Sequence, residues 1–357
     1  MTALTENETT AISLRWRKRA DTLARVQRHV QTQWSRRGFF GVAGTTGLLV
    51  VAACSGKQSN GSSANGAVTV KHVFGETTVP APPRRVVSAG FTEQDDLLAL
   101  GVVPIAVTEW WGGEPFAVWP WAQPKLGSAQ PVVLSLNDGM QVDQIAGLKP
   151  DLIVATNAGI DQDTYHKLSA IAPTIPQSGQ DAFFEPWKVQ AASIGQAVFK
   201  VDEMKALITA VDDKFVTAGK NNSQFSGKKV VLLQGTFVED SVVATLPGWR
   251  TDFLTQMGLV IPDSIHPFAR DDHRALIPRN QVVPVLNAAD VLIWSTETDD
   301  DQGALALDPT FQQLNATTRK RNIFTGKELA GAIAFASPLS YPVVADRLPP
   351  MIAKALI

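Results

Sequence analysis

Residues 84–102 read RRVVSAGFTEQDDLLALGV, and this stretch decides the class of fold. Its first apolar run ends at Gly90, which is typical of a buried strand followed by a turn. Thr92 is a favourable N-cap for a helix over residues 93–100, which a glycine closes. A second apolar strand is expected at 102–107. A strand, a helix and a further strand in this order predict an α/β protein with a parallel sheet.

The same alternation continues through the rest of the chain. Strands are expected at 150–155, 174–175, 228–235, 290–294 and 321–324, and helices at 143–148, 161–170, 248–257, 281–286 and 340–356. A helical stretch over 187–218, interrupted near 200–202, separates two similar halves, and Asp151 and Asp290 stand before an apolar strand at matching places in them. We therefore expect two Rossmann-like α/β lobes with parallel-rich sheets, joined by a long helical linker. The expected boundaries are 68–186 for the N-terminal lobe, 187–219 for the linker and 220–357 for the C-terminal lobe.

The N-terminal segment has the features of an export signal. Arg36 and Arg37 precede an apolar run that ends at Cys54, and this run is shorter than the roughly 20 residues of a membrane-spanning helix. The arginine pair resembles a twin-arginine signal, and the small residues before the cysteine resemble a lipoprotein cleavage site. Cys54 is the only cysteine, and the alternative is that it is a small buried residue. We expect a lipoprotein signal at 1–53, a membrane anchor through lipid on Cys54, and a flexible tether at 54–67.

The composition excludes several classes of protein. The chain has 357 residues, of which 45% are hydrophobic and 18% charged, with a net charge of −2. These values are typical of a globular protein and exclude a disordered chain, a collagen-like repeat and a coiled coil. A near-neutral chain is also a poor candidate for nucleic-acid binding. The motifs G-x-S-x-G, H-E-x-x-H, G-x-G-x-x-G and Walker A are absent, so no enzyme is indicated.

Three segments occur together in an order that resembles a known family. They are PRRVV at 83–87, DDLLALGV at 95–102 and IAGLKPDLI at 145–153. They resemble the class III substrate-binding proteins of ABC importers for ferric siderophores, haem and cobalamin, over about residues 70–356. The resemblance implies a ligand cleft between two lobes, a position on the outer face of the cell membrane, and delivery of the ligand to a permease dimer. We expect a monomer that is not an enzyme and has no cofactor or metal site of its own.

The ligand class stays open between a ferric siderophore and haem, with cobalamin as a further alternative. A free metal ion is disfavoured because the chain has no His-rich loop and only two tyrosines. A ferric siderophore is favoured over haem because the arginine candidates outnumber the candidate axial ligands.

A tryptophan-rich loop supplies the first candidate ligand-binding residues. Residues 109–121 hold four of the nine tryptophans, interleaved with glycine and proline, which favours a loop after a strand. Loops at the carboxyl ends of strands line the crevice of open α/β sheets. Trp110 and Trp111 are therefore candidates for ligand contact, with packing of the loop as the alternative. For Trp119 and Trp121, packing is the favoured role.

Arginine and tyrosine supply the remaining candidates for the ligand site. Arg250, Arg270 and Arg274 lie in loops of the second half, and a guanidinium group matches the anionic oxygens of a chelate. The alternative is a solvated loop in which arginine and aspartate pair with each other. Tyr341, in the terminal helix, either reaches the cleft or packs in the core.

Acidic residues after the two matching strands are candidates for permease docking. In the family that the chain resembles, an acidic residue on each lobe meets arginines of the permease subunits. The matching residues here are Asp161 and Asp163 in the first half and Glu297 in the second. The family commonly uses glutamate, so the aspartates depart from its pattern. The alternative is that these acids only interact with a helix dipole.

Overall fold

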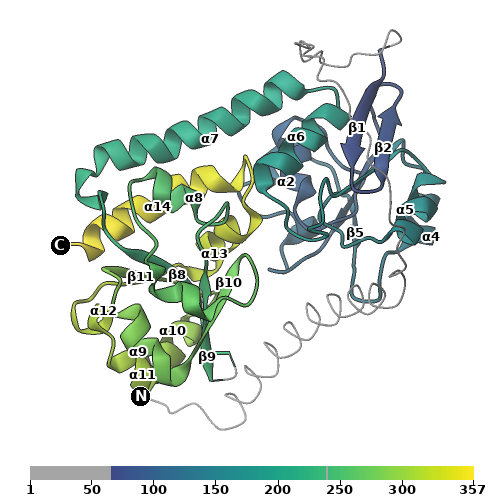
Figure 1. Ribbon diagram of the computed structural model, residues 1–357. Coiled ribbons are helices and arrows are strands. Elements are labelled where there is room, and N and C mark those ends of the chain that lie inside the picture. The colour runs from purple at the N-terminus through teal and green to yellow at the C-terminus, as the bar shows by residue number, and fades with distance from the viewer. Residues whose placement is uncertain (1–65, 239) are drawn as a thin grey trace, which may run out of the picture.

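The computed structural model describes residues 66–238 and 240–357 (Figure 1). The predicted signal, Cys54 and almost all of the predicted tether lie outside the described residues. Two α/β lobes lie side by side, and a long helix runs along the C-terminal lobe toward the N-terminal one. Across the two described ranges, none of the helices combines the length and apolar character that a membrane crossing needs.

The N-terminal lobe is built on a five-stranded parallel sheet in the order β5-β4-β3-β6-β7. Its strands are β3 (Val86–Ser88), β4 (Ala106–Thr108), β5 (Val132–Leu134), β6 (Leu152–Ala155) and β7 (Thr174–Pro176), and its helices are α2 (Glu93–Ala99), α3 (Gln123–Leu126), α4 (Val142–Gly147) and α5 (Gln162–Ser169). An antiparallel hairpin of β1 (Val68–His72) and β2 (Gly75–Val79) precedes this sheet. All residues of β3, β4, β6 and β7 are buried, as expected for a sheet that is covered on both faces.

The C-terminal lobe has a mixed sheet in the order β10-β9-β8-β11-β12. Its strands are β8 (Val230–Gln234), β9 (Ser241–Thr245), β10 (Arg274–Pro278), β11 (Val291–Ser295) and β12 (Asn322–Phe324), and its helices are α8 (Asp252–Gln256), α9 (Arg279–Leu286), α10 (Asp299–Leu307), α11 (Pro309–Gln312) and α12 (Asn315–Thr318). Strands β8, β11 and β12 are parallel, whereas β9 and β10 are antiparallel to their neighbours. The predicted α/β class with parallel-rich sheets is confirmed.

The predicted similarity of the two halves has a structural counterpart in the strand order and in two aspartates. Asp151 accepts hydrogen bonds from the backbone N–H groups of Arg84 and Arg85, at 2.8 and 2.7 Å, directly before β3. Asp290 accepts one from the N–H of Lys229, at 2.9 Å, directly before β8. Each carboxylate therefore ties the start of a central strand to the strand that follows the aspartate.

The linker consists of two helices, α6 (Trp187–Ala197) and α7 (Val201–Asn221). Helix α6 packs on α2 and β1 of the N-terminal lobe, whereas α7 continues to α8 and α14 (Ser340–Ala355) of the C-terminal lobe (Figure 1). The helices are separated at residues 198–200, where Phe199 has a φ of 63°. The interruption therefore precedes its predicted position by about two residues.

Strand β4 and helix α8 each begin four residues later than the sequence predicted. Strand β4 begins at Ala106 instead of residue 102. The N–H of Val102 donates to the carbonyl of Leu97 at 2.9 Å, so Val102 belongs to the end of the preceding helix. Pro104 has no N–H that could donate to a neighbouring strand. Helix α8 begins at Asp252 instead of residue 248, because the preceding residues form a turn in which Thr251 N–H donates to the carbonyl of Gly248.

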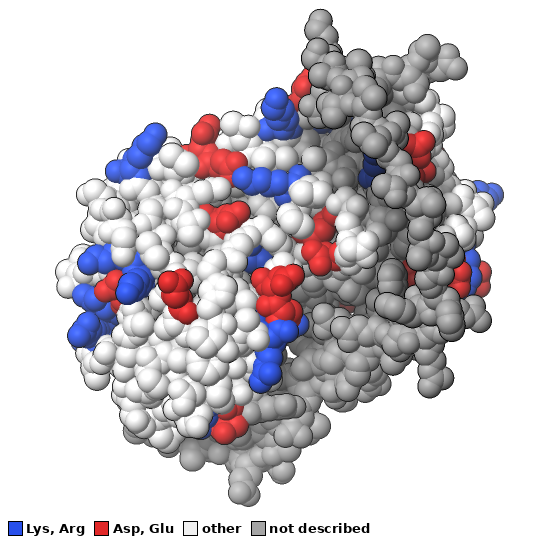
Figure 2. All heavy atoms as spheres, in the orientation of Figure 1, with Lys and Arg blue, Asp and Glu red and all other residues white. Residues whose placement is uncertain are grey.

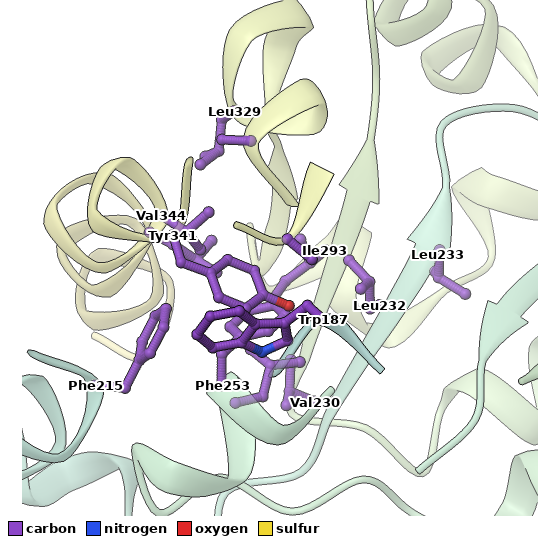
Figure 3. Close-up of a cluster of buried hydrophobic side chains, with 14 of the residues drawn as sticks. Trp187, Phe215, Val230, Leu232, Leu233, Phe253, Ile293, Leu329, Tyr341 and Val344 are labelled. Atoms are coloured by element: carbon purple, nitrogen blue, oxygen red, sulfur yellow. The ribbon is translucent and has the colours of Figure 1, made fainter. Parts of the chain in front are cut away.

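A large core cluster extends across both lobes beneath α7 and α14, and it contains Tyr341. The Tyr341 ring lies 5.4 Å from that of Trp187, 5.6 Å from Phe215 and 5.7 Å from Phe253, measured between centroids (Figure 3). The residue is only 2% exposed, and burial raises the pKa of its hydroxyl, which has no hydrogen-bond partner among the described residues. Tyr341 therefore packs in the core, which is one of the two roles that the sequence left open for it.

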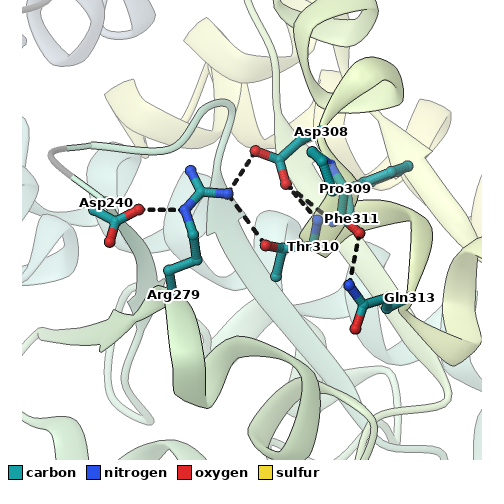
Figure 4. A network of polar contacts seen from close by, with 7 residues as sticks. All are labelled: Asp240, Arg279, Asp308, Pro309, Thr310, Phe311 and Gln313. Atoms are coloured by element: carbon teal, nitrogen blue, oxygen red, sulfur yellow. Dashed lines mark hydrogen bonds and ion pairs between the residues drawn. The ribbon is translucent and has the colours of Figure 1, made fainter.

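An arginine network joins β9, α9 and α11 in the C-terminal lobe (Figure 4). Arg279 donates from Nη1 to Asp308 Oδ2 at 2.7 Å and to Thr310 Oγ1 at 3.1 Å, and from Nε to Asp240. Its guanidinium carbon lies 4.2 Å from the centroid of the Phe237 ring. Arg279 thus stabilises the fold of the C-terminal lobe.

Candidate ligand-binding site between the lobes

The tryptophan-rich loop follows β4, as predicted, and two of its tryptophans anchor it. Trp119 is buried, and Trp121 stacks on it with ring centroids 4.9 Å apart. Trp121 Nε1 also donates to Asp95 Oδ2 at 2.7 Å. A Cβ at Gly331 of α13 (Gly326–Phe335) would lie 2.5 Å from the Trp119 ring, so a glycine there lets the C-terminal lobe approach this loop. The packing role predicted for Trp119 and Trp121 agrees with these contacts.

Trp110 lies where aromatic side chains of both lobes meet. Its ring centroid is 5.9 Å from Phe91, 4.8 Å from Phe184 and 5.6 Å from Phe335. Phe183 stacks on Phe91 at 5.6 Å. Phe335 ends α13 of the C-terminal lobe, whereas the other four belong to the N-terminal lobe. These five residues are called the aromatic cluster below. Trp111 lies beside it, edge-on to Trp110 at 6.1 Å and to Trp119 at 4.9 Å.

Arg250 places a cation against the aromatic cluster from the other lobe. Its guanidinium carbon lies 5.1 Å from the ring centroid of Phe184 and 4.2 Å from that of Trp249. Burial lowers the pKa of Arg250 to about 10, and the group stays charged at neutral pH. Among residues 66–238 and 240–357, no carboxylate forms an ion pair with it. A half-buried guanidinium between aromatic faces, without a carboxylate partner, is suited to receive an anionic or strongly polar oxygen of a ligand.

Arg270 and Arg274 lie nearer to solvent than Arg250. Both are exposed, on the segment that leads into β10. Arg274 donates to Asp271 Oδ2 from Nε at 2.9 Å and from Nη2 at 2.8 Å, which is the arginine–aspartate pairing that the sequence left as an alternative. The charges of Arg274 and Asp271 both act on Arg250, so this pair lies near the rim of the same site.

A small cavity between the lobes is lined by Asn157, Phe184, Glu185, Trp249 and Phe335, among others. Phe184 has a φ of 58°, a strained backbone conformation for a residue with a side chain. Its N–H donates to Asn157 Oδ1 at 2.8 Å, and Asn157 Nδ2 donates to Thr92 Oγ1 at 3.0 Å. The Thr92 hydroxyl makes no cap to α2, contrary to the sequence prediction, because it bonds to Asn157 and Gln190 instead. Asn157 therefore holds the Phe184 ring where it faces Arg250.

Buried acidic residues of α2 lie next to this cavity. Glu93 Oε1 accepts from the N–H of Asn157 at 2.9 Å, and burial raises the pKa of Glu93 to about 7. Asp95 Oδ2 accepts from Ser337 Oγ of the C-terminal lobe at 2.6 Å, and burial raises the pKa of Asp95 to about 6. Burial likewise raises the pKa of Asp96 well above its usual range. Together with the ion pair of Lys327 and Glu114, the bond to Ser337 connects the two lobes.

Comparison with known proteins places this arrangement in a family. Residues 86–329 match the family described as "Periplasmic binding protein". The chain belongs to the periplasmic binding protein family. Members of this family bind substrates for transport, so the prediction that the protein is not an enzyme is confirmed.

Similar structures and relatives agree with this family. A periplasmic solute binding protein from Mycobacterium smegmatis is 65% identical, with a TM-score of 0.78 over 82% of this chain and 99% of that one. PiaA from Streptococcus pneumoniae in complex with ferrichrome is 23% identical, with a TM-score of 0.68 over 81% and 98%, a likeness of fold. The relative "Probable siderophore-binding lipoprotein YfiY" of Bacillus subtilis is 28% identical over 71% of this chain and 77% of its own length.

The acidic residues expected to meet a permease lie at matching places in this periplasmic binding protein. Asp161 and Asp163 are exposed at the start of α5, which follows β6, and Glu297 is half-buried before α10, which follows β11. Asp161 caps α5 by accepting from the N–H of Thr164 at 2.8 Å. Asp161 therefore has a local role at the start of a helix, as the alternative in the sequence analysis stated. Its side chain is also exposed, so a further contact with a partner is sterically open.

The sequence did not identify four members of the aromatic cluster, Phe91, Phe183, Phe184 and Phe335. Phe91 follows β3 by three residues, and the phenylalanine pair follows β7, so their places after strands were a usable signal. Phe335 had no such signal, because it ends a helix of the other lobe. Within the described ranges, no group of three or more His, Cys, Asp or Glu side chains is arranged to hold a metal ion.

Proposed function

We propose that this periplasmic binding protein captures a ferric siderophore between its two lobes and delivers it to an ABC permease dimer. The observation that carries the proposal is Arg250, a half-buried cation between Phe184 and Trp249 that forms no ion pair with a carboxylate in the described part of the chain. A charge that is partly removed from water without a counter-charge is costly, so a ligand that brings anionic oxygens gains affinity there. The name of the relative YfiY, a siderophore-binding lipoprotein, supports the same ligand class.

Haem is the alternative ligand, and the composition of the site favours the siderophore. Haem iron is commonly held by an axial histidine, tyrosine, cysteine or methionine. The aromatic cluster and Arg250 include none of these side chains. Phenylalanine and tryptophan offer flat apolar surface without an iron ligand, which suits a metal ion that is already fully chelated.

The proposed place of action is the outer face of the cell membrane. The twin-arginine-type signal supports export, and lipid on Cys54 supplies the anchor, in agreement with the lipoprotein names of relatives. Asp161, Asp163 and Glu297 form the proposed docking residues for the two permease subunits. On the face shown in Figure 2, positive and negative side chains are scattered among each other over the described residues, which is consistent with our inference that nucleic acid is not a partner.

Calorimetric titration of the protein with a ferric trihydroxamate tests the proposal. Arg250→Ala should weaken binding by about 1.5–3 kcal/mol, the range for hydrogen bonds to charged groups, which is roughly 10- to 150-fold in Kd. Trp110→Ala should weaken binding and also reduce the quenching of tryptophan fluorescence by the ligand. Arg274→Ala should change Kd much less, because this exposed arginine already pairs with Asp271. Arg319→Ala, on the exposed end of α12, is the matched control. Unchanged affinity in the Arg250 and Trp110 variants would remove this site from ligand binding.

A further inference from the structure

The balance of charge at the site between the lobes restricts the ligand more than its aromatic surface does. Arg250 is one cation, on which the charges of Arg274, Asp271 and Asp181 act. The pairs Arg274 with Asp271 and Lys327 with Glu114 are each neutral as a unit. Within residues 66–238 and 240–357, Arg250 is thus the half-buried cation that lies against the aromatic cluster without an ion pair.

The N-terminal side of the same cavity is acidic. Glu185 lines the cavity together with Phe184 and Trp249, and it is only 3% exposed. Its Oε2 accepts from Ser178, whereas its Oε1 has no hydrogen-bond partner in the part of the chain that the structure describes. Glu93, Asp95 and Asp96 lie on the same side of the cavity, and they accept hydrogen bonds from neutral hydroxyl, amide, indole and backbone groups. An anion that enters the cavity therefore meets one cation on one side and buried carboxyl groups on the other.

We propose that the ligand is a ferric chelate of low net charge, zero or −1, of the hydroxamate type, and not a polyanionic chelate of the catecholate or citrate type. This inference rests on the proposed function and narrows it. Ferric iron with three singly charged hydroxamates is neutral, whereas three doubly charged catecholates leave a net charge of −3. Arg250 balances one negative charge at most. Each further charge would be desolvated without a partner, beside carboxyl groups, at a cost of several kcal/mol.

The remaining features of the site suit a neutral chelate. The aromatic cluster offers flat apolar faces for an apolar ligand body, with Trp110 at 4.8 Å from Phe184 and 5.6 Å from Phe335 between centroids. The unpartnered Oε1 of Glu185 is a hydrogen-bond acceptor, and it matches an amide N–H of the ligand backbone. Arg250 then donates to the partly negative hydroxamate oxygens.

The test compares three ferric chelates by calorimetry on the full chain at one pH and one ionic strength: ferrichrome, ferric enterobactin and ferric dicitrate. Ferrichrome should bind at least about 100-fold more tightly than either polyanion, because two or more uncompensated charges are excluded. Glu185→Gln keeps the shape of the side chain but removes its charge, and it should narrow this ratio by improving the affinity for ferric enterobactin. Asp143→Asn, an exposed aspartate of α4, is the matched control and should leave the ratio unchanged.

The outcomes separate this inference from the proposed function. Enterobactin or dicitrate binding as tightly as ferrichrome would overturn the charge argument and leave siderophore capture standing. Failure of all three chelates to bind would overturn the proposed function itself, and the inference with it. A Glu185→Gln protein that folds normally by circular dichroism but keeps the original ratio of affinities would show that Glu185 does not discriminate between neutral and polyanionic chelates.

Discussion

Replacing Asp95 by asparagine should change how the stability of the protein depends on pH. Asp95 is fully buried, and both hydrogen bonds that it accepts, from Trp121 Nε1 and Ser337 Oγ, go to the same oxygen. The carbonyl oxygen of an asparagine side chain can accept both, so Asp95→Asn removes the titrating group with little change in geometry. Burial raises the pKa of Asp95 from 3.8 to about 6.

The raised pKa of Asp95 determines the sign and the size of the change in the free energy of unfolding with pH. An acid with a raised pKa binds more protons in the folded state, so its contribution to stability is complete below its pKa in the unfolded chain and is lost as pH rises through about 6. A shift of about two units, at about 1.4 kcal/mol per unit, gives a full amplitude of about 3 kcal/mol. Between about pH 4 and pH 7, the free energy of unfolding of Asp95→Asn should therefore gain roughly 2 kcal/mol relative to the parent.

Urea denaturation across this pH range measures the difference between the two proteins. Asp143→Asn, at an exposed position, should run parallel to the parent and serves as the control. Parallel curves for Asp95→Asn and the parent would refute the reasoning, because they would show that the Asp95 carboxyl has the same pKa in the folded and the unfolded chain.

Three further predictions concern anchoring, docking and motion. Cys54→Ala should release the protein from carbonate-washed membranes, and a variant that stays in the membrane fraction would contradict lipid anchoring, because Cys54 is the only cysteine. Reversing the charge at Asp163 and Glu297 together should abolish uptake in cells and leave the Kd for the chelate in solution unchanged, whereas normal uptake would exclude these residues as a docking pair. Small-angle scattering should change little when the ligand binds, because the helices α6 and α7 connect the lobes and Asp95 bonds to Ser337 across them. A large compaction on binding would show instead that residues 198–200 act as a flexible hinge.

The features that could be predicted from the sequence are those set by local residue patterns. The apolar strands, the linker helices and the matching places of Asp151 and Asp290 depend on periodicity and on residue type at strand starts, and both are visible in one segment at a time. The packing of Trp119 was predictable in the same way, from the glycines and prolines around it.

The missed features depend on how distant segments meet. Phe184 faces Arg250 because Asn157, 27 positions earlier in the chain, holds its backbone at a positive φ. Glu93 and Asp95 belong to a short helix whose sequence suggests one polar, exposed face. Both carboxyl groups are nevertheless buried, because the segment after β6, helix α6 and the C-terminal lobe cover them. No single segment carries the signal for such burial.

The location of bound iron tests the central claim most directly. Crystals of the protein grown with ferrichrome, measured at the iron absorption edge, give an anomalous peak at the position of the chelated metal. We expect one peak between the lobes, in the space bounded by Arg250, Trp110 and Phe335. A peak on the outer surface of either lobe would contradict capture between the lobes, as would a site that stays free of iron at saturating ferrichrome.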